Sequence, residues 1–291
     1  MDPSVAAREN NLGIGSLTLH FATWGQPTPD RPAVLLVHGL TVSHMEFAEL
    51  GPALAAAGHY VIAPDLRGRG LSDKPSHGYS ISIHANDLLT LCDTLGVRTF
   101  NYVGHSLGAI IGLYLGALYP QRIGKLVLID AGGKIPDDTA QAIGASVSRL
   151  GVVYPSMDAF LGLMRQLPVV KWNPFWERNF QYDAEVHADG TVTSRVPKAA
   201  IEEESMQLYF TRTEALPQVV RAPALVLRAE LGTLAPDRGF VLPAEEAERL
   251  RTVMPDCRLI VVPETNHYTI IESPQVQEAA IEFLGSAPSA G

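Results

Sequence analysis

The sequence predicts an α/β protein, with a mostly parallel central sheet, helices on both of its faces and a helical insertion. Three observations lead to this fold class. Short, nearly continuous apolar runs rich in Val, Ile and Leu recur along the chain, as strands buried on both faces do. Longer segments separate them, and parallel strands need such helical crossovers. One stretch of about 85 residues lacks these runs and is rich in aromatic side chains.

The apolar runs define the strands of the predicted sheet in chain order. Each has four or five residues, and the segments after most of them are long enough for a helix. The alternating stretch 17–21 is expected to end an antiparallel hairpin at the first edge of the sheet. The predicted strands are 33–37, 60–63, 100–103, 126–129, 224–227 and 259–262, and the predicted crossover helices are 44–57, 81–95, 107–119, 244–254 and 274–284.

The stretch 133–217 differs from the rest of the chain in composition. It holds 9 of the chain's 21 aromatic residues, together with three methionines. A helical insertion laid over one end of the sheet would have this character, since binding pockets favour such side chains. The sequence therefore predicts three segments: core residues 1–132, a helical cap over 133–217, and core residues 218–291.

Composition and charge exclude several classes of function. The 291 residues include 22 Lys and Arg against 31 Asp and Glu, which gives a net charge of −9 with no basic run. Nucleic-acid binding requires basic patches that neutralise phosphates, so we expect no nucleic-acid partner. Mean hydropathy is only +0.09, and no apolar stretch approaches the ~18 residues that a membrane span requires. We therefore expect no membrane partner either.

Cysteine usage and the N-terminal sequence bear on the compartment. Cys92 and Cys257 lie far apart and form neither a disulfide framework nor a metal-ligand cluster. The N-terminal residues have no apolar segment typical of a secretory signal. We expect a soluble cytoplasmic protein that is an enzyme. Nothing in the sequence predicts its oligomeric state.

The segment Gly104-His105-Ser106-Leu107-Gly108 matches the pattern G-x-S-x-G. A predicted strand runs directly into it, and an apolar helical segment follows at once. The flanking glycines allow a tight turn in which the serine backbone is strained and the hydroxyl projects into a cleft. The helix N-terminus then offers N–H groups to a developing oxyanion. A glycine-rich turn without catalytic function could share the pattern, but this context favours a nucleophile at Ser106.

A serine hydroxyl is a weak nucleophile at neutral pH and needs an adjacent base, most often histidine. His267 follows the last predicted strand by a few residues, at the same end of the sheet as Ser106. His38 and His105 lie in turns beside other motifs, and the remaining six histidines have no comparable position at a strand end. A surface loop is the alternative place for His267, and we take it as the candidate base.

Together these motifs resemble the α/β-hydrolase superfamily, in particular its serine esterases with a helical cap. Besides 104–108, the resemblance rests on His38-Gly39-Leu40 after the first parallel strand, on 65–72 after the next, and on the late Asn266-His267. It covers everything outside the insertion, and it is more specific for the fold than for the substrate. By this resemblance, the main-chain N–H groups of Leu40 and Leu107 would form the oxyanion hole.

Other residues of the same motifs are expected to be structural. In this superfamily, residues in the positions of Asp65, Arg67 and Arg69 usually brace loops near the cleft. The resemblance implies no cofactor and no metal. A serine nucleophile disfavours the superfamily's epoxide hydrolases and haloalkane dehalogenases, which have aspartate at the position of Ser106.

The carboxylate that would orient His267 is harder to identify. The superfamily order is serine, acid, histidine, and the commonest position for the acid is a turn after the penultimate strand. There the chain offers Glu230, which comes rather early, and Asp237, which comes rather late. Asp130 directly follows the strand next to the one that bears Ser106, and some family members carry their acid there. We favour Asp130 and keep Glu230 and Asp237 as alternatives.

The predicted activity is acyl transfer to water through an acyl-enzyme, with a small, largely hydrophobic carboxylic ester or lactone as substrate. Hydrolysis of a carbon–carbon bond in a dienoate or diketone is the first alternative. It would require a cation for the substrate carboxylate, such as Arg165, Lys171 or Arg178 in the insertion. A non-catalytic ligand receptor on the same fold is the second alternative, although an intact Ser106 and His267 argue against it.

Overall fold

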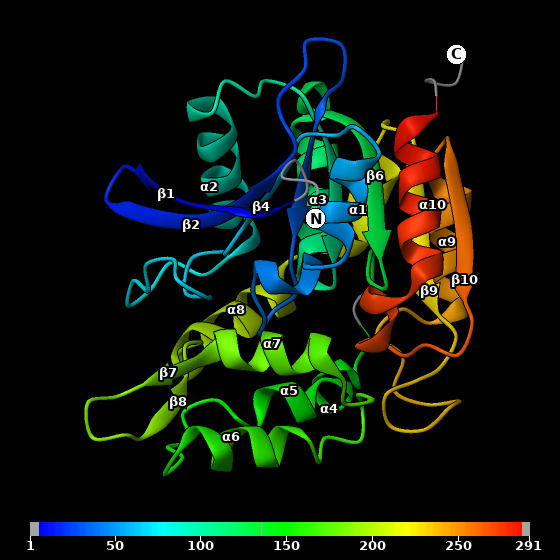
Figure 1. The fold of residues 1–291 in the computed structure, drawn as a ribbon. Coiled ribbons are helices and arrows are strands. Elements are labelled where there is room, and N and C mark those ends of the chain that lie inside the picture. The colour runs from blue at the N-terminus through cyan, green and yellow to red at the C-terminus, as the bar shows by residue number, and fades with distance from the viewer. Residues whose placement is uncertain (1–5, 135, 287–291) are drawn as a thin grey trace.

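A computed structural model describes residues 6–134 and 136–286 and contains an eight-stranded sheet at its centre (Figure 1). The strand order is β1-β2-β4-β3-β5-β6-β9-β10. The first two pairings are antiparallel and the others are parallel. The strands are β1 (Arg8–Ile14), β2 (Leu17–Trp24), β3 (Ala33–Val37), β4 (Val61–Pro64), β5 (Phe100–His105), β6 (Ile123–Ile129), β9 (Ala224–Ala229) and β10 (Cys257–Val262). The predicted α/β fold and the antiparallel edge hairpin are confirmed.

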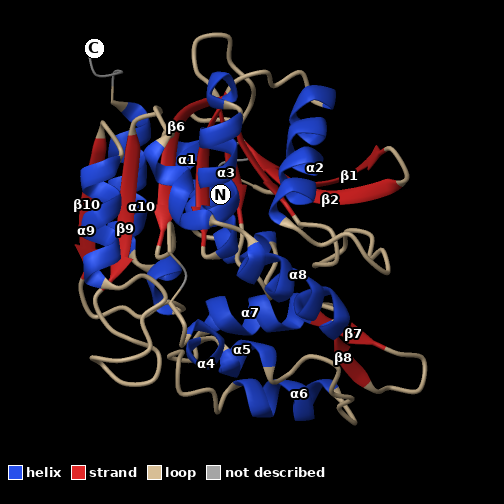
Figure 2. Ribbon diagram, turned by 180° about the vertical axis from the view of Figure 1, so that it is seen from behind, coloured by secondary structure: helices blue, strands red, loops and turns tan. Residues whose placement is uncertain are grey.

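Helices cover both faces of this sheet, and each face has its own apolar core. One core is shared by α2 (Ile81–Thr94), α3 (Leu107–Leu118) and α9 (Ala244–Val253), of which α2 and α3 stand before the strands in Figure 2. The opposite core is shared by α1 (Leu50–Ala56) and α10 (Pro274–Gly285). Burial on both sides explains why strands β3 and β4 are apolar at every position.

The crossover helices lie close to their predicted positions, with one difference. The segment predicted as a single helix over 44–57 is divided into a 3-10 turn, η2 (His44–Phe47), and α1. Ser43 caps η2, because its side chain accepts a hydrogen bond from the Met45 amide. Three further 3-10 turns are present. Two lie between a helix and the next strand, η3 (Pro120–Arg122) and η4 (Thr213–Gln218), and η5 (Thr269–Glu272) lies between β10 and α10.

The chain between β6 and β9 forms a layer at the carboxyl end of the parallel strands, in the lower half of Figure 1. Aromatic rings fill its interior, including the stacked pair Trp172 and Phe180 with ring centroids 5.8 Å apart. A short hairpin was not predicted, since strands of three residues are too short to show alternation. The elements of this layer are α4 (Thr139–Ala142), α5 (Gly144–Val147), α6 (Met157–Met164), α7 (Pro174–Asp183), β7 (Ala184–Val186), β8 (Val192–Ser194) and α8 (Lys198–Phe210).

Buried charges join this layer to the rest of the molecule. Glu204 of α8 is fully buried and pairs with both Arg69 and His84, the latter at 2.7 Å. Arg69 also donates to the carbonyl of Leu40 at 3.0 Å. The loop that follows β4 therefore connects α8 to the loop that follows β3.

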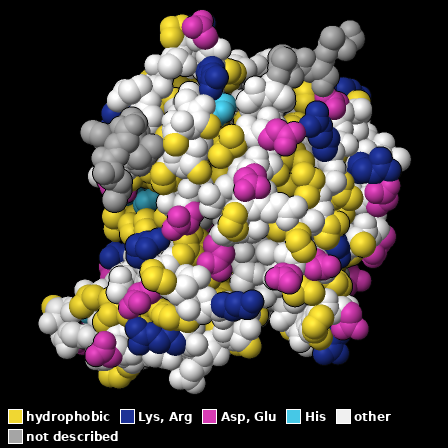
Figure 3. All heavy atoms as spheres, turned by 45° about the vertical axis from the view of Figure 1, so that its right-hand side comes forward, with side chains coloured by type: hydrophobic (Ala, Val, Ile, Leu, Met, Phe, Trp, Pro, Cys, Tyr) yellow, Lys and Arg dark blue, Asp and Glu magenta, His cyan; other side chains and the backbone are white. Residues whose placement is uncertain are grey.

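The outer surface carries charges of both signs. In the face shown in Figure 3, Lys and Arg side chains lie scattered among Asp and Glu side chains. Within the described residues, no helix combines the length and apolarity needed to cross a bilayer.

Candidate active site

Ser106 lies at the turn between β5 and α3, in a strained backbone conformation with φ of 54°. Such a conformation is uncommon for a residue with a side chain. The neighbouring glycines permit it: a Cβ on Gly104 would lie 2.3 Å from the Gly108 carbonyl, and one on Gly108 would lie 1.9 Å from the Val37 carbonyl. Any side chain at either position would push β5, α3 and β3 apart. The close packing of this turn therefore explains both glycines of the motif.

Three side chains from separate parts of the chain meet at this turn. The Oγ of Ser106 lies 3.0 Å from Nε2 of His267, and Nδ1 of His267 lies 2.8 Å from Oδ2 of Asp130. The other oxygen of Asp130 accepts a hydrogen bond from the Ala229 amide at 2.8 Å. The carboxylate is thus fixed by β9 on one side and holds the imidazole on the other.

The two alternative acids lie away from the imidazole. Glu230 accepts a hydrogen bond from the Glu264 amide at 2.9 Å and lines a separate surface pocket. Asp237 is exposed, at the tip of the loop between β9 and α9. The structure therefore brings Asp130, rather than Glu230 or Asp237, to His267.

The surroundings of His267 favour a neutral imidazole. Burial lowers the pKa of His267, and the nearby charge of His105 lowers it further, while the hydrogen bond to Asp130 offsets only part of this effect. A histidine whose pKa lies below the usual value of about 6.5 is mostly neutral at pH 7, and one of its ring nitrogens then carries a free lone pair. With Nδ1–H donating to Asp130, that lone pair is on Nε2 and faces Ser106.

A second histidine–carboxylate pair lies beside the first and was missed in the sequence. Nδ1 of His105 lies 2.7 Å from Oε1 of Glu46, and both side chains are buried. Burial alone would lower the pKa of His105, but the charge and hydrogen bond of Glu46 outweigh burial and raise it. Nε2 of His105 donates to the carbonyl of His267 at 3.0 Å. This pair therefore holds the loop that carries His267.

Glu46 also holds the loop after β3. Its Oε2 accepts a hydrogen bond from the Gly39 amide at 2.9 Å. His38 stabilises the same loop through both ring nitrogens: Nδ1 donates to the Gly39 carbonyl at 2.7 Å, and Nε2 accepts from the Leu66 amide at 3.0 Å. Burial lowers the pKa of His38 to about 4, so this imidazole is neutral and can accept.

Leu40 and Leu107 both lie on the wall of the cavity above Ser106. Among the described residues, neither main-chain N–H has a protein acceptor. Leu107 is the first residue of α3, where amides have no partner within the helix. The two N–H groups are therefore free to donate to an oxygen atom of a ligand.

The cavity itself has a volume of about 100 Å³ and is lined mainly by apolar side chains. Its floor holds Ser106 and His267, and its outer wall comes from the layer between β6 and β9. Among the described lining residues, Lys134 is the only lysine or arginine. The apolar lining includes Leu40, Val42, Leu107, Ile110, Ala131, Ile143, Leu208 and Val241.

The three cations suggested by the sequence do not line this cavity. Arg165 pairs with Glu177 and Arg178 pairs with Glu49, each with about half of its side chain exposed. Lys171 lines the separate surface pocket that contains Glu230. A buried arginine, Arg149, borders an adjoining cavity of about 40 Å³, but it is bound to Asp183 and to main-chain carbonyls.

Comparisons with known proteins agree with this arrangement. A family model described as alpha/beta hydrolase fold matches residues 32–274. The 2-(acetamidomethylene)succinate hydrolase of Mesorhizobium japonicum is 30% identical over 274 residues, which are 93% of this chain and 92% of that protein. The crystal structure of E-2-(acetamidomethylene)succinate hydrolase matches with a TM-score of 0.84 at 25% identity, covering 97% of this chain and 100% of that one.

A shorter match is to a hydrolase of hydroxybutyrate oligomers. The 3-hydroxybutyrate-oligomer hydrolase of Cupriavidus necator is 34% identical over 136 residues, which are 46% of this chain and 45% of that protein. The named relatives thus include hydrolases of different substrates.

Proposed function

Since the chain belongs to the α/β-hydrolase family, we propose that it hydrolyses a small, largely hydrophobic carboxylic ester or lactone through an acyl-enzyme on Ser106. One observation carries the proposal: at the floor of a mainly apolar cavity, the Ser106 hydroxyl lies 3.0 Å from His267, whose burial lowers its pKa. Nucleophile, base and orienting carboxylate thus have the geometry of a hydrolytic triad.

In the first half of the reaction, Nε2 of His267 takes the proton of Ser106 while Oγ attacks the substrate carbonyl carbon. The N–H groups of Leu40 and Leu107 donate to the carbonyl oxygen as it becomes negative. Asp130 stabilises the imidazolium and holds its Nδ1–H in place. His267 then protonates the leaving alcohol, and the ester bond breaks.

In the second half, water replaces the alcohol. His267 takes a proton from the water as its oxygen attacks the acyl-enzyme, and the same N–H groups stabilise the second oxyanion. Collapse of this intermediate returns the proton to Oγ of Ser106 and releases the carboxylic acid. A lactone follows the same steps, with the leaving hydroxyl still attached to the product.

The cavity supports the choice of substrate. Its lining is mainly apolar and its volume is about 100 Å³, so it suits a short acyl chain better than a large or charged group. Residues 133–217 would act as a cap that selects the substrate, since Ile143 and Leu208 contribute to the wall. The partial match to a hydrolase of 3-hydroxybutyrate oligomers is consistent with ester chemistry.

A second candidate is hydrolysis of a small unsaturated dicarboxylate, including cleavage of a carbon–carbon bond. It is favoured by the 30% identity to a 2-(acetamidomethylene)succinate hydrolase. Such a substrate needs a cation for its carboxylates, and Lys134 on the cavity wall is the candidate. Arg149 is less suited, because Asp183 already neutralises it at 2.9 Å.

The deciding experiment is a panel of p-nitrophenyl esters of increasing chain length, short lactones and 2-(acetamidomethylene)succinate, assayed with the natural chain and with Ser106→Ala. We expect turnover of short esters or lactones, lost by a factor of 10⁴ or more in Ser106→Ala. Turnover of the dicarboxylate alone, reduced by Lys134→Gln, would favour the second candidate. Equal turnover by Ser106→Ala would contradict both.

A further inference from the structure

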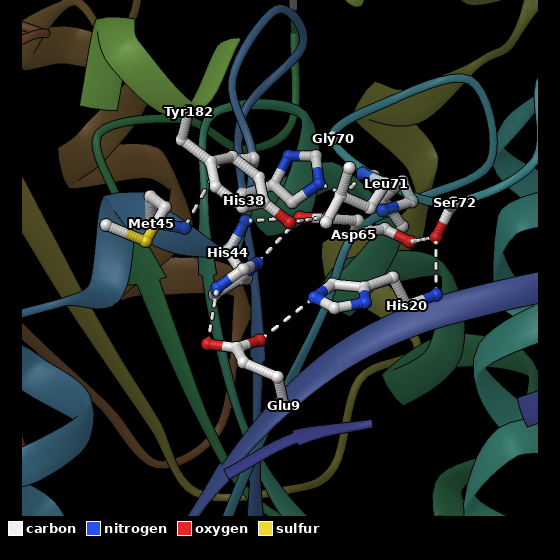
Figure 4. A network of polar contacts seen from close by, with 12 residues as sticks. Glu9, His20, His38, His44, Met45, Asp65, Gly70, Leu71, Ser72 and Tyr182 are labelled. Atoms are coloured by element: carbon white, nitrogen blue, oxygen red, sulfur yellow. Dashed lines mark hydrogen bonds and ion pairs between the residues drawn. The ribbon is translucent and has the colours of Figure 1, made fainter. Parts of the chain in front are cut away.

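A cluster of two histidines and one glutamate lies outside the active site, at the antiparallel edge of the sheet. Glu9 belongs to β1, His20 to β2 and His44 to η2. Figure 4 shows both imidazoles turned toward the carboxylate of Glu9. The proposed serine mechanism uses none of these side chains.

Strand register explains how two of the three residues meet. Asn11 on β1 lies directly opposite His20 on β2. Glu9 is two residues from Asn11, so it lies on the same face of the hairpin and diagonal to His20. The third residue, His44, comes from the 3-10 turn after β3 and faces the hairpin from the core.

The donor atoms are close enough to share one ion. Nε2 of His20 lies 2.9 Å from Oε2 of Glu9, and Nε2 of His44 lies 3.6 Å from Oε1 of the same residue. The ligand atoms of the three residues all lie within 4.8 Å of one another. Donor atoms around a four-coordinate zinc ion are about 3.3 Å apart, given bond lengths of about 2.0–2.2 Å. Glu9 is half exposed on an edge strand, so its side chain can make the small adjustment needed.

The other ring nitrogen of each histidine is already held. Nδ1 of His44 donates to Oδ1 of Asp65 at 2.9 Å, and Nδ1 of His20 lies 3.0 Å from Oδ1 of Asn11. Metal-binding histidines usually donate their second N–H to a carboxylate or other oxygen, which fixes the tautomer and aims the free nitrogen. Both imidazoles therefore direct Nε2 toward Glu9 when they are neutral.

We propose that Glu9, His20 and His44 bind one divalent transition-metal ion, with zinc as the representative ion. Two imidazoles and one carboxylate suit zinc and its neighbours, whereas magnesium and calcium prefer oxygen ligands alone. His20 and His44 are 5% and 2% exposed, whereas Glu9 is half exposed, so an ion can reach the site from solvent on the side of Glu9. Three protein ligands leave a fourth position for water or for a ligand from solution.

The ion would connect parts of the chain that are distant in sequence. It would join the edge hairpin to η2, which also contains Glu46 of the second histidine–carboxylate pair. Asp65, the partner of His44, accepts a further hydrogen bond from Tyr182 of α7 at 2.7 Å. Bound metal is therefore expected to stabilise the junction of hairpin, core and cap without entering the chemistry at Ser106.

The test is zinc binding to tag-free protein after dialysis against a chelator, measured by titration calorimetry with ZnCl₂ alone. We expect one equivalent bound per chain, and at least about a 10-fold weaker affinity in Glu9→Gln and in His20→Gln. His77→Gln, which changes an exposed histidine outside the cluster, is the matched control and should bind as the natural chain does. His267→Gln should also retain binding, which separates this site from the triad.

Two further measurements test whether the ion binds at the cluster rather than elsewhere on the protein. Cobalt(II) in place of zinc should give visible ligand-field bands that Glu9→Gln lacks, and saturating zinc should raise Tm by a few degrees in the natural chain but not in Glu9→Gln. Glu9→Gln changes an exposed side chain, so it tests the site even if His20→Gln fails to fold. Absence of binding to the natural chain, or equal binding by Glu9→Gln, would overturn the proposal.

Discussion

Two buried histidine–carboxylate pairs lie side by side at the end of the sheet, with the rings of His105 and His267 centred 4.6 Å apart. Both imidazoles use Nδ1 to contact a carboxylate, at 2.7 Å and 2.8 Å. Yet the pKa of His105 is raised and that of His267 is lowered. The same pairing thus favours the charged imidazole in one case and the neutral one in the other.

The difference between the pairs shows how neighbours determine what a pair can do. Burial lowers the pKa of both histidines, and Glu46 overcomes it for His105. The resulting charge then lowers the pKa of His267. One pair acts as a fixed ionic support, while the other keeps a free lone pair toward Ser106. The predictions below test this division of roles.

The largest effect is expected from the pair that contacts Ser106. In Asp130→Asn, the imidazole loses the acceptor that selects its tautomer, and we expect kcat to fall by a factor on the order of 10⁴ with a much smaller change in KM. Glu230→Gln is the matched control and should keep kcat within about twofold. Steady-state kinetics on the best ester of the panel would measure both, and a collapse in the control instead would assign the acid to Glu230.

The supporting pair should matter less. Glu46→Gln removes the charge that holds His105 and weakens the hydrogen bond to the Gly39 amide. A displaced catalytic loop can cost about 10²-fold in rate, and we expect a fall in kcat of that size. Glu248→Gln, on the exposed surface, should have no effect on kcat. A loss as large as that in Asp130→Asn would show that the two pairs do not have separate roles.

The pH profile should follow the base rather than its charged neighbour. Because the pKa of His267 is lowered, kcat/KM should rise with pH along an acid limb whose midpoint lies below about 6.5 and should be level near pH 7. Each pH unit below the midpoint costs about tenfold. Rates measured between pH 4.5 and 8 would test this, and a midpoint above pH 7 would mean that His267 is the charged member.

The smallest effect is expected from Leu208, a residue of the cavity wall that belongs to neither pair. Leu208→Ala widens the cavity by removing an apolar side chain of α8. We expect KM for short esters to rise about 3- to 10-fold, with preference shifting toward longer acyl chains and the acid limb unchanged. Met206→Ala, an exposed position on the same helix, serves as the control. A shifted acid limb in Leu208→Ala would contradict the separation of substrate choice from chemistry.

Some features could be predicted from sequence because they are local. Buried strands are continuous apolar runs, and the serine turn requires glycine on both sides of Ser106, so both leave a pattern within a few residues. Asp130 and His267 each follow a strand, and strands that run parallel bring such residues to one edge. The sequence alone left Glu230 and Asp237 open, because it does not show where a loop turns.

Other features depend on contacts between distant segments. Glu46 is 59 positions from His105, and its role follows from a 3-10 turn that the apolar pattern does not distinguish from a helix. The cluster of Glu9, His20 and His44 likewise needs the hairpin register and the position of η2. Neither has a spacing that could have revealed it.

The central claim is that Ser106 is acylated with His267 as base, and labelling with a fluorophosphonate followed by intact-protein and peptide mass spectrometry tests it most directly. We predict a single adduct, mapped to Ser106, that forms in the natural chain and in Glu230→Gln. The adduct should be absent in Ser106→Ala and should form far more slowly in His267→Gln and Asp130→Asn. An unlabelled natural chain, or an adduct on another residue, would contradict the account.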